Sequence, residues 1–70
     1  MKTSLGEKLK ELRNDNGWTQ QQVADMLHIS RVNYTRYETN AASPDYDTLA
    51  NIADIFDVSL DYIFGRKKYD

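Results

Sequence analysis

The chain has 70 residues, no cysteine and a formal net charge of −2. This length predicts one small domain, whose core is marginal unless its helices pack closely or a partner covers it. Without cysteine, neither a disulfide framework nor a thiolate metal site is available. The N-terminal residues MKTSLGEKLK contain no apolar run, so we expect neither a secretory signal nor a membrane span, and a cytoplasmic location.

The first predicted helix carries Leu5, Leu9 and Leu12. Their spacing by four and then three positions places them on one face of a helix, which we expect to be buried. Asn16-Gly17 ends this helix, because both residues tolerate the left-handed conformation of a C-cap.

A second, short helix is predicted to begin after Thr19. Thr19 is an N-cap residue, and Gln22 three positions later completes a capping box. The period of 3.6 residues then gathers the apolar side chains on one face of this helix. These side chains are Val23, Ala24 and Leu27.

A third helix is predicted after the tight turn His28-Ile29-Ser30, with Ser30 as its cap. Tyr34 and Tyr37 are expected to point inward. The outward face of this helix then carries Arg31, Val32, Thr35 and Arg36. Two short helices joined by such a turn are typical of a helix-turn-helix.

The polar residues 39–44 form a connector, after which Asp45 caps a fourth helix. Its inward stripe is Leu49, Ile52, Ala53 and Phe56. Ser59 caps a fifth helix, and Gly65 stops it. The predicted fold class is therefore all-α, a compact five-helix bundle.

These residues resemble the Cro and phage-repressor type of helix-turn-helix regulators, also called the xenobiotic-response-element family. The match rests on Gln20, Ala24, Ile29-Ser30 and Arg36-Tyr37-Glu38, and continues through residues 6–13 and 44–65. It implies a lambda-repressor-like DNA-binding domain over residues 1–65, followed by a short basic tail or the start of a linker at 66–70. His28 departs from the family, which usually has a glycine with positive φ there; histidine tolerates that conformation at a modest cost.

The resemblance implies sequence-specific binding to double-stranded DNA by a transcriptional regulator. We expect a repressor that binds an inverted-repeat operator with its third helix in the major groove. Activation by contact with polymerase is equally compatible with the sequence. The residues expected to contact bases are Arg31, Val32, Asn33, Thr35 and Arg36. Those expected to contact phosphates are Gln20, Thr19, Thr39 and Asn40, together with backbone N–H groups of the connector. Arg13 and Glu38 are expected to form a supporting salt bridge, and Leu60, Tyr62 and Phe64 are a candidate dimer surface.

The sequence gives no support for an enzyme, a cofactor or a metal site. His28 is the only histidine, and a lone histidine cannot build a metal site or a catalytic triad. The expected partners are double-stranded DNA, a second copy that associates weakly until both bind DNA, and polymerase or another protein. We expect either a complete protein that dimerises through its fifth helix or the DNA-binding half of a longer regulator.

Charge divides the chain into unlike parts. Residues 1–36 carry six basic and four acidic groups, residues 37–65 carry six acids and no base, and residues 66–70 have a net charge of +2. The negative field would then lie on the half that faces away from DNA. An alternative stays open, in which the protein is an interaction module, such as an antitoxin or anti-repressor, whose acidic face at residues 45–61 binds a partner.

Overall fold

The computed structural model describes residues 4–64, and within that range the chain forms five helices and no strand. The helices are α1 (Leu5–Asp15), α2 (Gln20–Leu27), α3 (Arg31–Glu38), α4 (Tyr46–Phe56) and α5 (Leu60–Ile63). The predicted all-α, five-helix fold is therefore confirmed. The predicted stop at Gly65, the domain end at 65 and the basic tail at 66–70 lie outside the described residues.

A capping side chain precedes every helix and accepts a hydrogen bond from a backbone N–H of the first turn. The caps are Ser4, Thr19, Ser30, Asp45 and Ser59. The last four confirm the sequence prediction, as does the Thr19–Gln22 capping box, in which Gln22 Oε1 lies 2.8 Å from the Thr19 nitrogen. Ser4 forms a second capping box with Glu7, which the sequence analysis had not identified.

Left-handed residues set where α1 and α2 end. His28 has φ 59° and ψ 41°, so this histidine adopts the positive φ that the family resemblance assigns to a glycine. Gly17 has φ 69°, whereas Asn16 before it stays right-handed with φ −89°. Only the glycine of the predicted Asn16-Gly17 pair therefore uses the left-handed conformation.

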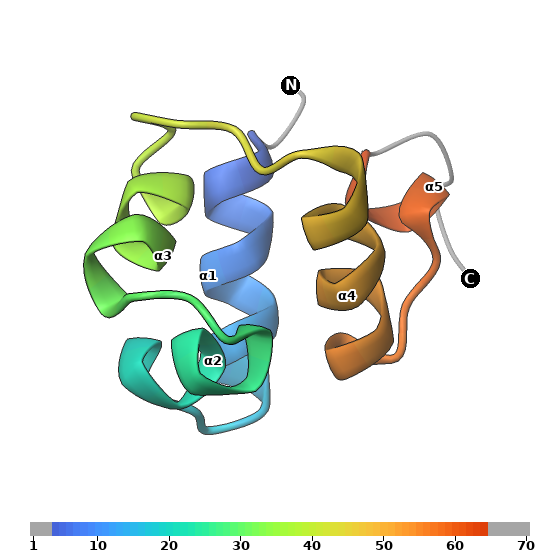
Figure 1. Cartoon of the computed structure of the whole chain (residues 1–70). Helices are drawn as coiled ribbons and strands as arrows, with labels where there is room; N and C mark the ends of the chain where they lie inside the picture. The colour runs from blue at the N-terminus through green and yellow to red at the C-terminus, as the bar shows by residue number, and fades with distance from the viewer. Residues whose placement is uncertain (1–3, 65–70) are drawn as a thin grey trace.

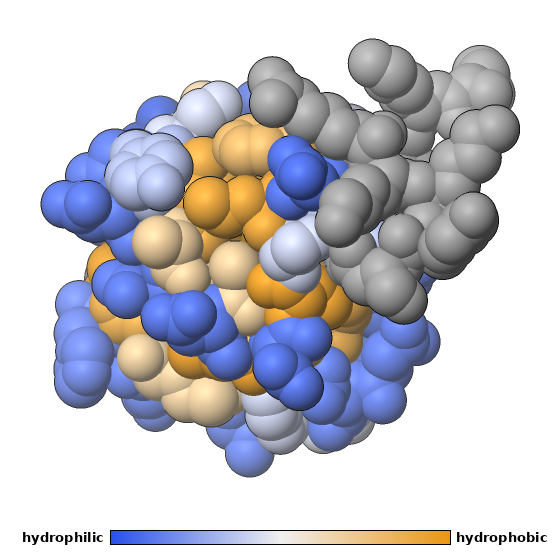
Figure 2. All heavy atoms as spheres, turned by 90° about the vertical axis from the view of Figure 1, so that its right-hand side faces the viewer, coloured by the Kyte–Doolittle hydropathy of each residue, from blue (hydrophilic) through white to orange (hydrophobic). Residues whose placement is uncertain are grey.

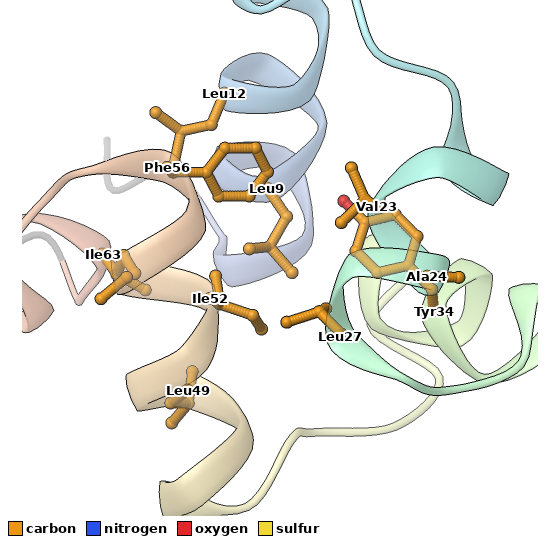
Figure 3. Close-up of a cluster of buried hydrophobic side chains, with 11 residues drawn as sticks. Leu9, Leu12, Val23, Ala24, Leu27, Tyr34, Leu49, Ile52, Phe56 and Ile63 are labelled. Carbon is orange, nitrogen blue, oxygen red and sulfur yellow. The ribbon is translucent and has the colours of Figure 1, made fainter.

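Figure 1 shows α1 in the middle of the molecule, with α2 and α3 on one side and α4 and α5 on the other. The core is formed by one face of each helix (Figure 3), and Tyr34, Leu9, Ile52 and Val23 are its largest fully buried side chains. All the predicted inward residues of α2 and α4 are buried, and Leu5 and Tyr37 are half-buried. The ring of Trp18 stacks on Phe56 with centroids 5.6 Å apart, which ties the start of the helix-turn-helix to α4.

Gly6 sets how closely α1 approaches α3. A Cβ atom at this position would lie 2.2 Å from the carbonyl oxygen of Glu38 and 2.8 Å from that of Tyr37. Backbone atoms cannot rotate away as a flexible side chain can, so only glycine permits this contact. The close approach fixes the end of α3 against the start of α1.

Candidate nucleic-acid interface

One face of α3 is left open to solvent. Arg31, Val32, Asn33 and Arg36 are exposed, with Val32 at 60% of its surface. The opposite face buries Tyr34 completely and Glu38 to 8% exposure. Neither arginine forms an ion pair with the residues that the structure describes. The exposed face of α3 thus carries two guanidinium groups without an ion-pair partner among the described residues, while the opposite face of the helix is packed in the core.

Thr35 differs from its predicted place on that outward face. It is half-buried, and its hydroxyl donates a hydrogen bond of 2.8 Å to Oε1 of Gln20 on α2. The predicted outward placement of Thr35 rested on helical phase alone and did not include this bond. Phase identifies the neighbours of Thr35 on α3 but not a side chain approaching from another helix.

Arg13 and Glu38 form the predicted salt bridge, which joins α1 to the last residue of α3. Nε and Nη2 of Arg13 donate to the two carboxylate oxygens of Glu38 at 2.6 and 3.1 Å, and Nη1 donates to the Trp18 carbonyl at 3.0 Å. The two side chains are only 12% and 3% exposed. A bidentate pair of this kind fixes direction as well as distance.

Gln20 connects this pair to the rest of the interface. Its Nε2 donates to Oε1 of Glu38 at 3.0 Å, while its Oε1 accepts from Thr35. A continuous polar chain therefore runs from Arg13 through Glu38 and Gln20 to Thr35. It links α1, α2 and α3 beneath the exposed face of α3.

The ionisation of this cluster follows from its geometry. Burial by itself would raise the pKa of the Glu38 carboxyl, but the hydrogen bonds from Arg13, with that from Gln20, hold it below its ordinary value. The bond to Glu38 correspondingly raises the pKa of Arg13. Burial also raises the pKa of the Tyr34 phenol, whose hydroxyl lies near Glu38 without a hydrogen bond of acceptable geometry to any described residue. The cluster is thus an ionised pair beside a neutral phenol.

In the connector after α3, the side chains of Thr39 and Asn40 form hydrogen bonds within the domain that were not predicted from the sequence. Oδ1 of Asn40 accepts from the Gly6 nitrogen at 3.0 Å, and its Nδ2 donates to Oγ of Ser4 at 3.1 Å. Asn40 adopts φ 63° to reach these partners. The Thr39 hydroxyl donates to the Arg36 carbonyl at 3.3 Å.

Backbone N–H groups of the connector are also engaged. Those of residues 39–42 bond to carbonyls of α3, so these four N–H groups are already used within the domain. Thr39 and Asn40 nevertheless stay exposed at the surface. At the start of α2, Thr19 is exposed and Gln20 is half-buried.

Two sets of contacts were not predicted from the sequence: those of Gln20 with Thr35 and Glu38, and those of Asn40 with α1. The first had a detectable signal, since Thr35 and Glu38 are three positions apart and share one side of α3. The second set of contacts depends on the left-handed conformation of Asn40, which no local sequence pattern predicts. Within residues 4–64, no group of three or more His, Cys, Asp or Glu side chains is placed to hold a metal ion.

These features define a helix-turn-helix domain. A tight turn with a left-handed residue, His28, joins α2 to α3. Side chains of α1 and α2 hold α3 by hydrogen bonds, and its outer face is exposed. A model of the family described as Helix-turn-helix matches residues 9–63. The chain belongs to this family, in its Cro/C1-type branch. No helix among the described residues is long and apolar enough to cross a membrane.

Curated relatives agree with this family assignment, and a solved structure agrees with the fold. The chain is 53% identical over 59 residues to the uncharacterised regulator YqaE of Bacillus subtilis, covering 84% of this chain and 51% of that protein. It is 41% identical to the transcriptional regulator ImmR of the same organism, covering 90% and 50%. The chain thus spans about half the length of these curated relatives. The fold matches the crystal structure of the P22 c2 repressor with a synthetic operator, with a TM-score of 0.84, 21% identity, and coverage of 89% and 94%.

Proposed function

We propose that this chain binds double-stranded DNA sequence-specifically as the DNA-binding domain of a transcriptional regulator, with α3 in the major groove. The observation that carries the proposal is the two-sided nature of α3. Its inner face is locked by Tyr34 and Glu38 while its outer side chains remain free. The names of the relatives, and the operator in the P22 c2 complex, support this reading.

The exposed residues of α3 have the chemistry that base recognition requires. A guanidinium can donate two parallel hydrogen bonds to O6 and N7 of guanine, and the methyl groups of a valine can contact the methyl of thymine. We assign these roles to Arg31, Arg36 and Val32. Asn33 reaches a base edge or a phosphate.

Phosphate contacts would come from both sides of α3. Thr19 and Gln20 lie at the start of α2, where a helix N-terminus favours an anion. Thr39 and Asn40 lie in the connector with exposed side chains, and the Thr39 hydroxyl would turn from the Arg36 carbonyl to a phosphate oxygen. Such contacts place the protein on the duplex without reading its sequence.

A dimer would complete the site. Two copies on one face of DNA would read half-sites about 34 Å apart in an inverted repeat. Figure 2 shows apolar surface on the face of the molecule that α4 and α5 form, bordered by hydrophilic residues. On α5, Leu60 and Tyr62 are half-buried, and Phe64 at its C-terminal end is 47% exposed. We propose that this small surface joins two copies only weakly until DNA brings them together.

The regulator would act as a repressor in the cytoplasm by excluding polymerase from the bound site. Selection of bound sequences from random duplexes tests the proposal, with the salt dependence of binding measured on the selected site. An inverted-repeat consensus and a steep loss of affinity with salt are expected. A protein that enriches no sequence, binds no duplex and instead co-purifies with a partner on its acidic face would overturn it.

A further inference from the structure

We propose that Thr35 is a positioning residue that acts on DNA through Gln20, by fixing which way the Gln20 amide faces. This inference rests on the proposed DNA-binding function. It assigns to Thr35 a different role from that of its exposed neighbours on α3.

The geometry separates Thr35 from those neighbours. Arg31, Val32 and Arg36 are exposed, whereas Thr35 is half-buried and its hydroxyl proton is given to Oε1 of Gln20 at 2.8 Å. A hydroxyl has a single proton to donate. Thr35 therefore has none left for a base edge while this bond is in place.

The chemistry of the amide explains what the bond achieves. A glutamine side chain ends in one acceptor oxygen and one nitrogen with two donor hydrogens, and the two ends have nearly the same shape. In the observed orientation Nε2 faces the Glu38 carboxylate at 3.0 Å and Oε1 faces Thr35. The reverse orientation would set the amide oxygen against an anionic oxygen, which is repulsive. Glu38 and Thr35 therefore select the same one of the two orientations.

One donor is left over in that orientation. Glu38 takes one hydrogen of Nε2, and the second hydrogen has no acceptor among the described residues. A backbone phosphate of DNA is an acceptor with no proton to offer, so it complements a fixed N–H and would repel a fixed amide oxygen. The polar chain from Arg13 to Thr35 thus presents Gln20 as a donor before DNA arrives. Less conformational freedom is lost on binding as a result.

The test uses two substitutions at one position. Thr35→Val keeps the shape of the side chain but removes the hydroxyl, and Thr35→Ser keeps the hydroxyl. Each is made in the wild-type chain and in the Gln20→Ala variant. Affinity is measured for the duplex that the wild type selects and for an unselected duplex of equal length. Because one neutral hydrogen bond is at stake, Thr35→Val should weaken both by roughly three- to tenfold per bound protomer, and Thr35→Ser should bind like the wild type.

The Gln20→Ala background separates an indirect role from a direct one. If Thr35 acts through Gln20, Thr35→Val should have no further effect once Gln20 is absent. A loss confined to the selected duplex, or an equal loss in both backgrounds, would overturn the inference and make Thr35 a direct contact. Failure of Thr35→Ser to bind like the wild type would also overturn it.

A measurement without DNA keeps this inference distinct from the proposed function. The two side-chain N–H resonances of Gln20, identified by their loss in Gln20→Ala, should move in Thr35→Val and stay in place in Thr35→Ser. Unmoved resonances in Thr35→Val would overturn the positioning role. If the resonances move as expected but the wild type binds no duplex DNA, the proposed function fails and with it the role of Thr35 on DNA. Thermal unfolding of each variant shows whether the fold persists, and Thr35→Ala replaces Thr35→Val if the valine variant does not fold.

Discussion

The carboxylate of Glu38 accepts hydrogen bonds from both Nε and Nη2 of Arg13, at 2.6 and 3.1 Å, although the two residues are far apart in the chain. This pair joins the first helix of the domain to the last residue of α3. Both side chains are almost fully removed from solvent, so the loss of one partner would leave the other charge buried without compensation.

Arg13→Met should therefore destabilise the domain by about 3 kcal/mol, a large part of the stability of a chain of this size. Arg13→Met combined with Glu38→Leu should recover much of that loss, because no isolated charge then remains. Recovery should be incomplete, since Gln20 loses its acceptor in the double variant. Chemical denaturation of the single and double variants measures the coupling, with the exposed Lys10→Met on the same helix as a control. Additive effects would mean that the pair contributes no coupling energy.

The stability of the domain should also depend on pH through Glu38. Its pKa is held below the ordinary value of 4.5 in the folded state, so its contribution is fully present above that value and is lost as pH falls through the lower folded-state pKa. Arg13 stays protonated throughout, because its pKa is raised from an already high value. The destabilisation caused by Glu38→Gln should thus be largest at neutral pH and should shrink in acid. Denaturation curves of both proteins across the acidic range measure this difference, and a gap that stays constant with pH would contradict it.

Gly6→Ala should destabilise the domain although alanine is the better helix former. The added methyl group would meet the Glu38 carbonyl oxygen at 2.2 Å, and α1 would have to move away from α3. We expect a net loss of about 1–3 kcal/mol, because overpacking outweighs the gain in helix propensity. Thermal unfolding measures it, and Glu11→Ala on the exposed side of α1 is the control. A variant as stable as the wild type would show that the contact can relax without cost.

Arg36→Ala should change sequence preference as well as affinity. A bidentate contact to a base carries about 1–3 kcal/mol of discrimination, so its removal should weaken the selected site and relax the preference at one base pair. Gln20→Ala should instead weaken all duplexes by a similar factor, since a phosphate contact carries no sequence information. Competition binding on a set of single-base variants compares the two. If Arg36→Ala lost the same affinity for selected and unselected DNA, Arg36 would not be a residue that contacts a base.

Local signals were enough to predict the five helices. Capping residues such as Thr19, Ser30 and Asp45 act within one turn of their own helix, and the apolar stripes follow from helical periodicity. The Arg13–Glu38 pair was expected from family resemblance, and its geometry confirms it.

Contacts between distant segments were harder to predict. Helical phase alone placed Thr35 outward, because it ignores a partner such as Gln20 on another helix. The left-handed conformation of Asn40 was not predicted for the same reason, because its side chain forms hydrogen bonds with Ser4 and Gly6 at the start of the chain. Side chains that link separate helices are decided by tertiary packing, which periodicity does not encode.

The stack between Trp18 and Phe56 gives the domain an optical reporter of its own. Trp18 is the only tryptophan in the chain, and it sits where α2 begins, with its ring on α4 and its carbonyl bonded to Arg13. Its emission should respond when the helix-turn-helix separates from α4, before or together with global unfolding. Fluorescence can therefore be compared with the helical signal in circular dichroism for every variant described above. A variant that changes only the tryptophan emission has altered the contact between Trp18 and Phe56. A variant that changes both the emission and the circular dichroism signal has lost the fold.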